Sequence, residues 1–262
     1  MLRLILKAVD GLIRLALSLA LATAGAYAAY ALWDNNQVYG AAANVQADMI
    51  RLKPDAGGDA GESGPSFAQL LAINPDVCGW VTMDGTRIDH PVLQGETNLS
   101  YINTDVYGNF ALAGSIFLDT RCDRSFAGGY SLLYGHHMDS GGMFGDLDQY
   151  KEERFFDENR TGSLILPGGI HALRTFACLL LGASDDVIFQ PERWRDDIAG
   201  LLEYAGQNAL HVDEDAIADM RRILNDPGAN APRVLALSTC SAEFTDARTI
   251  VLAWIQDDAP AD

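Results

Sequence analysis

The stretch VLALSTC, residues 234–240, decides the fold, because an apolar run of this length bounded by polar residues is typical of a buried strand. Its last residue is one of only four cysteines in the chain. We therefore expect Cys240 at the end of a strand, where a rigid scaffold can present a reactive thiol. The alternative is a small buried hydrophobic residue, since free cysteine is among the most buried residue types.

Short apolar runs separated by turn residues fill most of the chain after residue 76. Besides VLALSTC they are CGWVTM (78–83), DGTRIDHPVLQ (84–94), GSIFLD (114–119), YSLLYGHH (130–137), SLILPGG (163–169), HALRTFACLLLGA (171–183) and RTIVLAWIQ (248–256). Such a series of eight runs predicts a mainly β protein, either a barrel or a sandwich.

Helical patterns lie around these runs. We expect a helix over residues 36–52, a linker rich in glycine, proline and aspartate over 53–66, and a short helix FAQLLAI (67–73) with Ser66 as its N-cap. A helical region at about 191–224 precedes the cysteine strand. Its apolar stripe includes Trp194, Ile198 and Leu201, and we interpret the stripe as core packing.

The N-terminus contains an uncharged run of 19 residues, from Leu15 to Trp33. As a helix it spans about 28 Å, close to the thickness of a bilayer core. Arg3, Lys7 and Arg14 precede the run, which predicts a cytoplasmic N-terminus, a single membrane-spanning anchor and an extracellular remainder. A cleaved signal peptide is the alternative, since the alanine-rich part offers cleavage sites.

Charge and cysteine content exclude some functions and leave others open. The formal net charge of −18, with no basic stripe, argues against nucleic-acid binding. The cysteines show no metal-ligand spacing, so we predict no metal site. In an exported protein four cysteines suggest two disulfides, but the count alone does not separate a disulfide partner from a nucleophile.

Two further features point to chemistry. His136 and His137 begin a glycine-rich loop after an apolar run, and because neighbouring side chains of an extended chain point to opposite faces, only one of them can face a site. Arg248 begins the strand that follows the cysteine strand, and antiparallel pairing of the two would bring it near Cys240. The alternatives are a structural histidine and an ion pair of Arg248 with Glu243 or Asp246.

Together these residues supply the parts of a thiol acyl-transfer site. A thiolate is the nucleophile, a histidine takes and returns the proton, and an arginine stabilises the developing oxyanion. The chain has no phosphate-binding glycine loop, so nucleotide chemistry has no support.

The same residues carry a family resemblance. LSTC followed by Arg248, with YGH about a hundred residues upstream, resembles the sortases, membrane-anchored cysteine transpeptidases of Gram-positive cell surfaces. The segments NPDVCGWVTMDGTRIDHPVLQ, AGSIFLDTR, YGHHMDSGGMFGDL and LSTCSAEFTDAR are similar, in order and spacing, to class B members. The resemblance runs from about Phe67 to Trp254.

The resemblance implies an eight-stranded sortase β-barrel with N-terminal helices and a helical insertion before the cysteine strand. It implies that Cys240 attacks the Thr carbonyl of a C-terminal sorting signal, with His136 and Arg248 as its catalytic partners. The thioacyl enzyme would then pass the surface protein to an amine of the peptidoglycan precursor, a lipid II-type cross-bridge. Candidate substrate contacts are Ser238, Asn98, Ile102 and Ile188.

The resemblance requires no cofactor and no metal, and it makes the other three cysteines buried thiols. We expect a cytoplasmic tail and anchor over 1–33, a helix and linker over 34–66, and a catalytic domain over 67–262. A pilin-polymerising sortase, an exported thiol hydrolase on the same fold, and a catalytically silent binding module are the alternatives. Nothing in the sequence identifies the sorting signal or the amine.

Overall fold

The computed structural model describes residues 1–54, 66–182, 187–240 and 247–256. The chain divides into two compact units, Met1–Ala41 and Ala42–Asp262. The predicted linker lies almost entirely outside the described residues.

The first unit lies within a single long helix, α1 (Leu2–Ile50). The sequence predicted two separate segments here, an anchor over 15–33 and a helix over 36–52, and the structure joins them. Since no proline or glycine pair interrupts residues 33–37, nothing in the local sequence breaks the helix.

The predicted transmembrane anchor is wrong. Across the described part of the chain, no helix combines the length and the apolar character needed to cross a membrane. The predicted single-pass topology and the predicted membrane partner both depended on this anchor, so they lose their support. The prediction counted missing charges, but residues 22–31 are alanine, glycine, threonine and tyrosine, which gain much less than leucine on leaving water.

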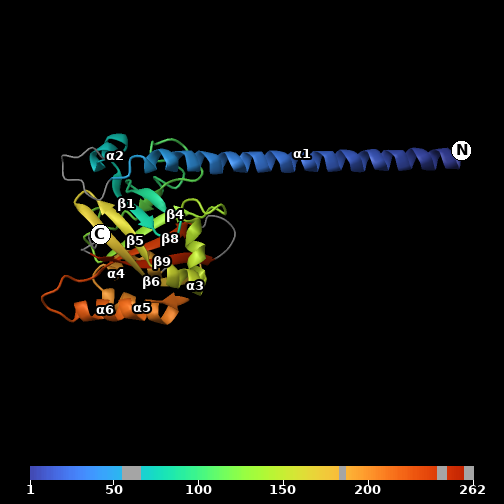
Figure 1. Cartoon of the computed structure of the whole chain (residues 1–262). Coiled ribbons are helices and arrows are strands. Elements are labelled where there is room, and N and C mark those ends of the chain that lie inside the picture. Colours follow the sequence, from blue (N-terminus) through green and yellow to red (C-terminus); the bar gives the residue numbers. More distant parts are fainter. Residues whose placement is uncertain (55–65, 183–186, 241–246, 257–262) are drawn as a thin grey trace. The chain divides into compact units, whose positions relative to one another are not determined.

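Eight strands of the second unit close into a barrel, as the sequence predicted, and a ninth short strand is attached to it (Figure 1). The strands are β1 (Val77–Met83), β2 (Asp89–Leu93), β3 (Ile116–Leu118), β4 (Tyr130–His136), β5 (Thr161–Leu166), β6 (Gly169–Gly182), β7 (His211–Val212), β8 (Arg233–Cys240) and β9 (Ala247–Gln256). Their order is β5-β1-β2-β3-β4-β8-β9-β6-β7, and the β5–β6 pairing closes the barrel.

Two central strands are buried on both faces, which explains their continuous apolar sequences. Residues Val234–Leu237 of β8 and Leu132–Leu133 of β4 are fully buried. The covering layer on one side is η1 (Gly145–Lys151), which packs against β6, β8 and β9.

The remaining helices are short. They are α2 (Phe67–Ile73), α3 (Glu153–Glu158), η2 (Val187–Phe189), α4 (Pro191–Trp194), α5 (Ile198–Asn208) and α6 (Glu214–Leu224). The predicted helical insertion before β8 is confirmed as α4, α5 and α6, with β7 between the last two. Both α5 and α6 pack against β6 and against each other (Figure 1). The apolar stripe of the insertion is buried core, as expected.

Two local predictions have mixed outcomes. Helix α2 has the predicted bounds, but the Ser66 side chain makes no capping hydrogen bond. Cys78, Cys122 and Cys178 are free and buried, and burial raises the pKa of each thiol to about 12. These three side chains are therefore protonated, unreactive core residues at neutral pH.

Candidate active site

The strand register brings together residues that are far apart in the sequence. Strands β4 and β8 are parallel neighbours, and the last pair of their ladder joins His136 with Cys240. Strands β8 and β9 are antiparallel, with Ser238 opposite Ile250. The β8–β9 ladder ends at this pair, and Arg248 lies two residues before Ile250 on β9, towards the end of β8 that carries Cys240. The three candidate catalytic residues therefore lie at the same end of the sheet.

Gly135 permits close packing at the position directly before His136. A Cβ atom at this position would lie 2.4 Å from Ile116 Cδ1 and 2.8 Å from the ring of Phe144. The Phe144 amide also donates to the His136 carbonyl at 3.0 Å. The glycine before the histidine is thus required by the packing of β4 against the segment that leads into η1.

The His136 imidazole is half-buried and has a fixed partner. Its Nε2 lies 2.7 Å from the backbone oxygen of Ile102. Because a carbonyl only accepts, Nε2 carries the proton, and in the neutral ring Nδ1 is left as the acceptor. Gly114 allows the carbonyl to approach, since its φ is +56° and a Cβ there would lie 2.2 Å from the Ile102 oxygen.

His137 has a separate environment, as the alternation of side chains predicted. Its Nε2 lies 3.1 Å from Asp148 of η1, and the other oxygen of that carboxylate accepts from the Thr249 hydroxyl at 2.6 Å. Burial alone would raise the pKa of Asp148, but hydrogen bonds from Thr249 and Lys151 hold it below its ordinary value. His137 therefore belongs to a polar cluster between η1 and β9, in which Lys151 and Asp148 form an ion pair at 3.0 Å.

Arg248 is held by an aromatic ring. Its guanidinium carbon lies 4.8 Å from the centre of the Phe189 ring, within the range of a cation–π contact. Its Nε is buried and has no hydrogen-bond partner among the described residues. Glu243 and Asp246, the alternative ion-pair partners, lie outside those residues. A guanidinium with an unused donor is suited to bind a developing negative charge.

The four candidate substrate contacts differ in exposure. Ile102 is half-buried and contributes the carbonyl beside His136, whereas the side chains of Ser238 and Ile188 are fully buried. The Asn98 amide donates to Asp119 at 3.0 Å, and its oxygen accepts from the Thr120 amide at 2.8 Å. Asn98 therefore fixes its own loop, and contact with substrate stays a prediction for all four.

Sequence reasoning missed the residues that support this end of the barrel. Tyr134 lies two positions before His136, and its ring stacks on Phe189 with centroids 6.3 Å apart. Asp119 is fully buried and accepts hydrogen bonds from Tyr134 and Arg121. The sequence did contain a signal for Tyr134. Side chains alternate between the two faces of a strand, so residue 134 lies on the same face of β4 as His136. The contacts with Phe189 depend on tertiary proximity that no local pattern shows.

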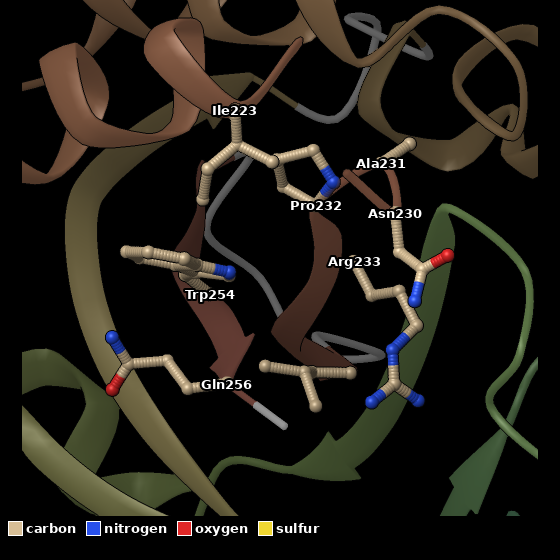
Figure 2. Close-up of a pocket in the computed structure, with 8 residues that line it drawn as sticks. Ile223, Asn230, Ala231, Pro232, Arg233, Trp254 and Gln256 are labelled. Atoms are coloured by element: carbon tan, nitrogen blue, oxygen red, sulfur yellow. The ribbon is translucent and has the colours of Figure 1, made fainter. Parts of the chain in front are cut away.

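A pocket elsewhere is not part of this arrangement. Figure 2 shows it between the start of β8 and the end of β9, with Asn230, Arg233, Trp254 and Gln256 around it. Strand β8 has eight residues, so its first residue lies about 23 Å from Cys240. Within the part of the chain that the structure describes, no group of three or more His, Cys, Asp or Glu side chains is arranged to hold a metal ion.

The comparisons with known proteins identify the family. No protein-family model matches the chain. A class B sortase of Streptococcus pyogenes, described as involved in pilus biogenesis, aligns over 72% of this chain and 97% of its own, with 36% sequence identity and a TM-score of 0.62. The Staphylococcus aureus sortase B–substrate complex aligns over 74% of this chain and 85% of its own, with 27% identity and a TM-score of 0.62. S. aureus sortase B is 28% identical over 193 residues, which are 73% of this chain and 75% of that protein.

These values show more than a shared fold, because the S. pyogenes protein is matched over nearly its whole length at 36% identity. The chain belongs to the class B sortases. It is therefore a sortase enzyme by family, and the barrel described above is the sortase fold.

Proposed function

We propose that this chain cleaves a C-terminal sorting signal after Thr through a thioacyl intermediate on Cys240, and transfers the protein to an amine of the cell-wall precursor. The single observation that carries the proposal is the register of His136 opposite Cys240, at the end of two parallel strands. A relative of known structure, the S. aureus sortase B–substrate complex, is in line with substrate binding by this fold.

The first half-reaction forms the acyl enzyme. The Cys240 thiol passes its proton to His136, and the resulting thiolate attacks the Thr carbonyl carbon. A C–S bond forms, and Arg248 stabilises the oxyanion. The C–N bond then breaks, and the leaving amine takes a proton from His136. The second half-reaction reverses these roles: an amine attacks the thioester, its proton passes to His136, and the C–S bond breaks. Ser238, Asn98, Ile102 and Ile188 are proposed to form or support the peptide groove.

The division of the chain follows from this proposal. We propose that the catalytic domain comprises residues 67–262, which follow the end of α1 at Ile50 and the predicted linker. The other three cysteines take no part, because burial keeps them protonated.

The test uses the full chain, a set of sorting-signal pentapeptides and mass spectrometry. Without an added amine, we expect a thioacyl adduct mapped to Cys240, which Cys240→Ala abolishes. His137→Gln is the matched control for His136→Gln, since the two histidines are adjacent but only the first lies beside position 240. Absence of any adduct across the set, with Cys240 still alkylated freely, would contradict the proposal.

The acceptor is tested separately. A peptidoglycan-type diamine and a pilin lysine peptide are offered to the acyl enzyme in competition. Preferential ligation of the diamine supports wall anchoring. Preferential ligation of the lysine peptide would favour pilin polymerisation, in line with the description of the S. pyogenes relative. Hydrolysis alone, with neither amine incorporated, would favour a thiol hydrolase.

A further inference from the structure

The segment FLDTR, residues 117–121, has no role in the chemistry above, yet it contains the most fully buried carboxylate near the site. Asp119 directly follows β3 and has an exposed fraction of 0%. A charge removed from water in this way is costly unless hydrogen bonds and an opposite charge compensate it. Its partners therefore indicate what the position does.

Asp119 gathers partners from three segments. Arg121 binds it through two nitrogens, with Nε 2.9 Å from Oδ1 and Nη2 2.8 Å from Oδ2. Asn98 donates from the loop after β2 at 3.0 Å, and the Tyr134 hydroxyl donates from β4 at 3.1 Å. Burial would raise the pKa of Asp119, but these hydrogen bonds, led by Arg121, keep it below its ordinary value. The carboxylate is thus charged and fully bonded.

Arg121 extends the cluster to the segment before α4. The same Nη2 that binds Asp119 also donates to the Phe189 backbone oxygen at 2.8 Å, and Nη1 lies 3.3 Å from Glu192 of α4. A planar guanidinium can make both sets of bonds at once because its donors point in fixed directions. Arg121 therefore couples the end of β3 to η2.

Phe189 is consequently held on two sides. Arg121 fixes its backbone, and Tyr134, whose hydroxyl is fixed by Asp119, stacks on its ring at 6.3 Å. The same ring also contacts the guanidinium of Arg248, whose central carbon lies 4.8 Å from the ring centre. Through this series of contacts, a change at Asp119 or Arg121 alters the surface against which Arg248 rests.

We propose that Asp119 and Arg121 are positioning residues that hold Phe189, and through it Arg248, in the place needed for acyl transfer. The inference rests on the proposed function in assigning Arg248 to the oxyanion. Neither residue touches substrate in this scheme, so their effect is on the rate of the chemical step and not on the reactivity of the thiol.

The kinetic test compares Arg121→Gln and Arg121→Lys with a matched control, Arg174→Gln. Arg174 also binds a buried aspartate, Asp213, at 2.8 and 3.0 Å. It lies seven residues along β6 from Leu181, the partner of Arg248, or about 23 Å. Both substitutions thus remove an arginine that binds a buried aspartate, but only Arg121 contacts Phe189.

We expect both Arg121 variants to lower kcat and kcat/KM together by about 10- to 100-fold, the range reached when a reacting group is displaced by about 1 Å. Arg121→Lys keeps the charge but loses the planar guanidinium that binds both Asp119 oxygens and the Phe189 carbonyl, so it should not rescue. Alkylation of Cys240 by iodoacetamide should stay at the wild-type rate. Arg174→Gln should keep wild-type kcat whatever its Tm. Equal kcat losses in Arg121→Gln and Arg174→Gln, or full activity in Arg121→Lys, would overturn the proposal.

A second measurement does not depend on activity. Hydrogen exchange followed by mass spectrometry should show faster exchange of residues 187–194 in Arg121→Gln than in wild type or Arg174→Gln. If the wild-type chain transfers no acyl group, this readout still tests the positioning contact. Unchanged exchange in Arg121→Gln overturns the positioning role even in an active enzyme.

Discussion

Replacing Gly135 by alanine tests whether packing requires a glycine at the position before the active-site histidine. The added Cβ would lie 2.4 Å from Ile116 and 2.8 Å from the Phe144 ring, and neither side chain has room to move, since their exposed fractions are 1% and 0%. Overpacking of this kind costs about 1–3 kcal/mol. For a domain of this size each kcal/mol lowers Tm by about 2–4 °C.

We therefore expect Gly135→Ala to lower Tm by roughly 2–12 °C. It should also lower acyl transfer by up to about 100-fold, because relief of the clash displaces His136. The control is Gly168→Ala, where a Cβ meets nothing within 4 Å. In a double-mutant cycle with Phe144→Leu, the destabilisations should be less than additive, since the smaller side chain relieves the contact. A Gly135→Ala protein that melts and reacts like Gly168→Ala would refute the reasoning.

Three further predictions follow from the buried groups and the paired histidines. Burial lowers the pKa of His90 to about 4, so between about pH 6.5 and pH 4 the unfolded chain binds a proton that the folded chain does not. Urea unfolding at pH 7 and pH 4 should show that His90→Gln loses less stability on acidification than wild type, by about 3 kcal/mol; equal losses contradict this. His136→Gln should abolish acyl transfer while His137→Gln keeps most of it, and the reverse order in a ligation assay would reject the assignment. Alkylation of the folded protein at neutral pH should modify Cys240 alone, and rapid modification of any of the three buried cysteines would disprove their protonated, inaccessible state.

The sequence was informative wherever a single strand or helix carries its own signal. All eight apolar runs contain or overlap a strand of the barrel, because alternation and continuous burial leave a direct mark on composition. The helical insertion was found for the same reason. The anchor was mispredicted because absence of charge was taken as apolarity in an alanine-rich segment.

The site was predicted only in part, for a physical reason. His136 and Cys240 were recognisable in the sequence as reactive groups. The family resemblance implied that they act together, and the strand register places them opposite each other. The cluster around Asp119 joins residues 98, 121 and 134, and Arg121 extends it to Phe189. The contacts to Asn98, Tyr134 and Phe189 are not local, and an Asp-Thr-Arg triplet whose aspartate is buried has the same sequence as an ordinary exposed turn. Only the three-dimensional arrangement separates the two.

The register of β4 against β8 explains why the support around the site is so dense. These strands are parallel, and a slip of one residue would place His137, not His136, beside position 240 and exchange their faces. Contacts on both faces of β4 oppose such a slip. On one face Gly135 is fitted against Phe144 and Ile116, and on the other the Tyr134 hydroxyl binds the buried Asp119. Because the two contacts are at neighbouring residues on opposite faces, no slipped register satisfies both. The same packing that closes the barrel thereby selects which histidine stands opposite Cys240.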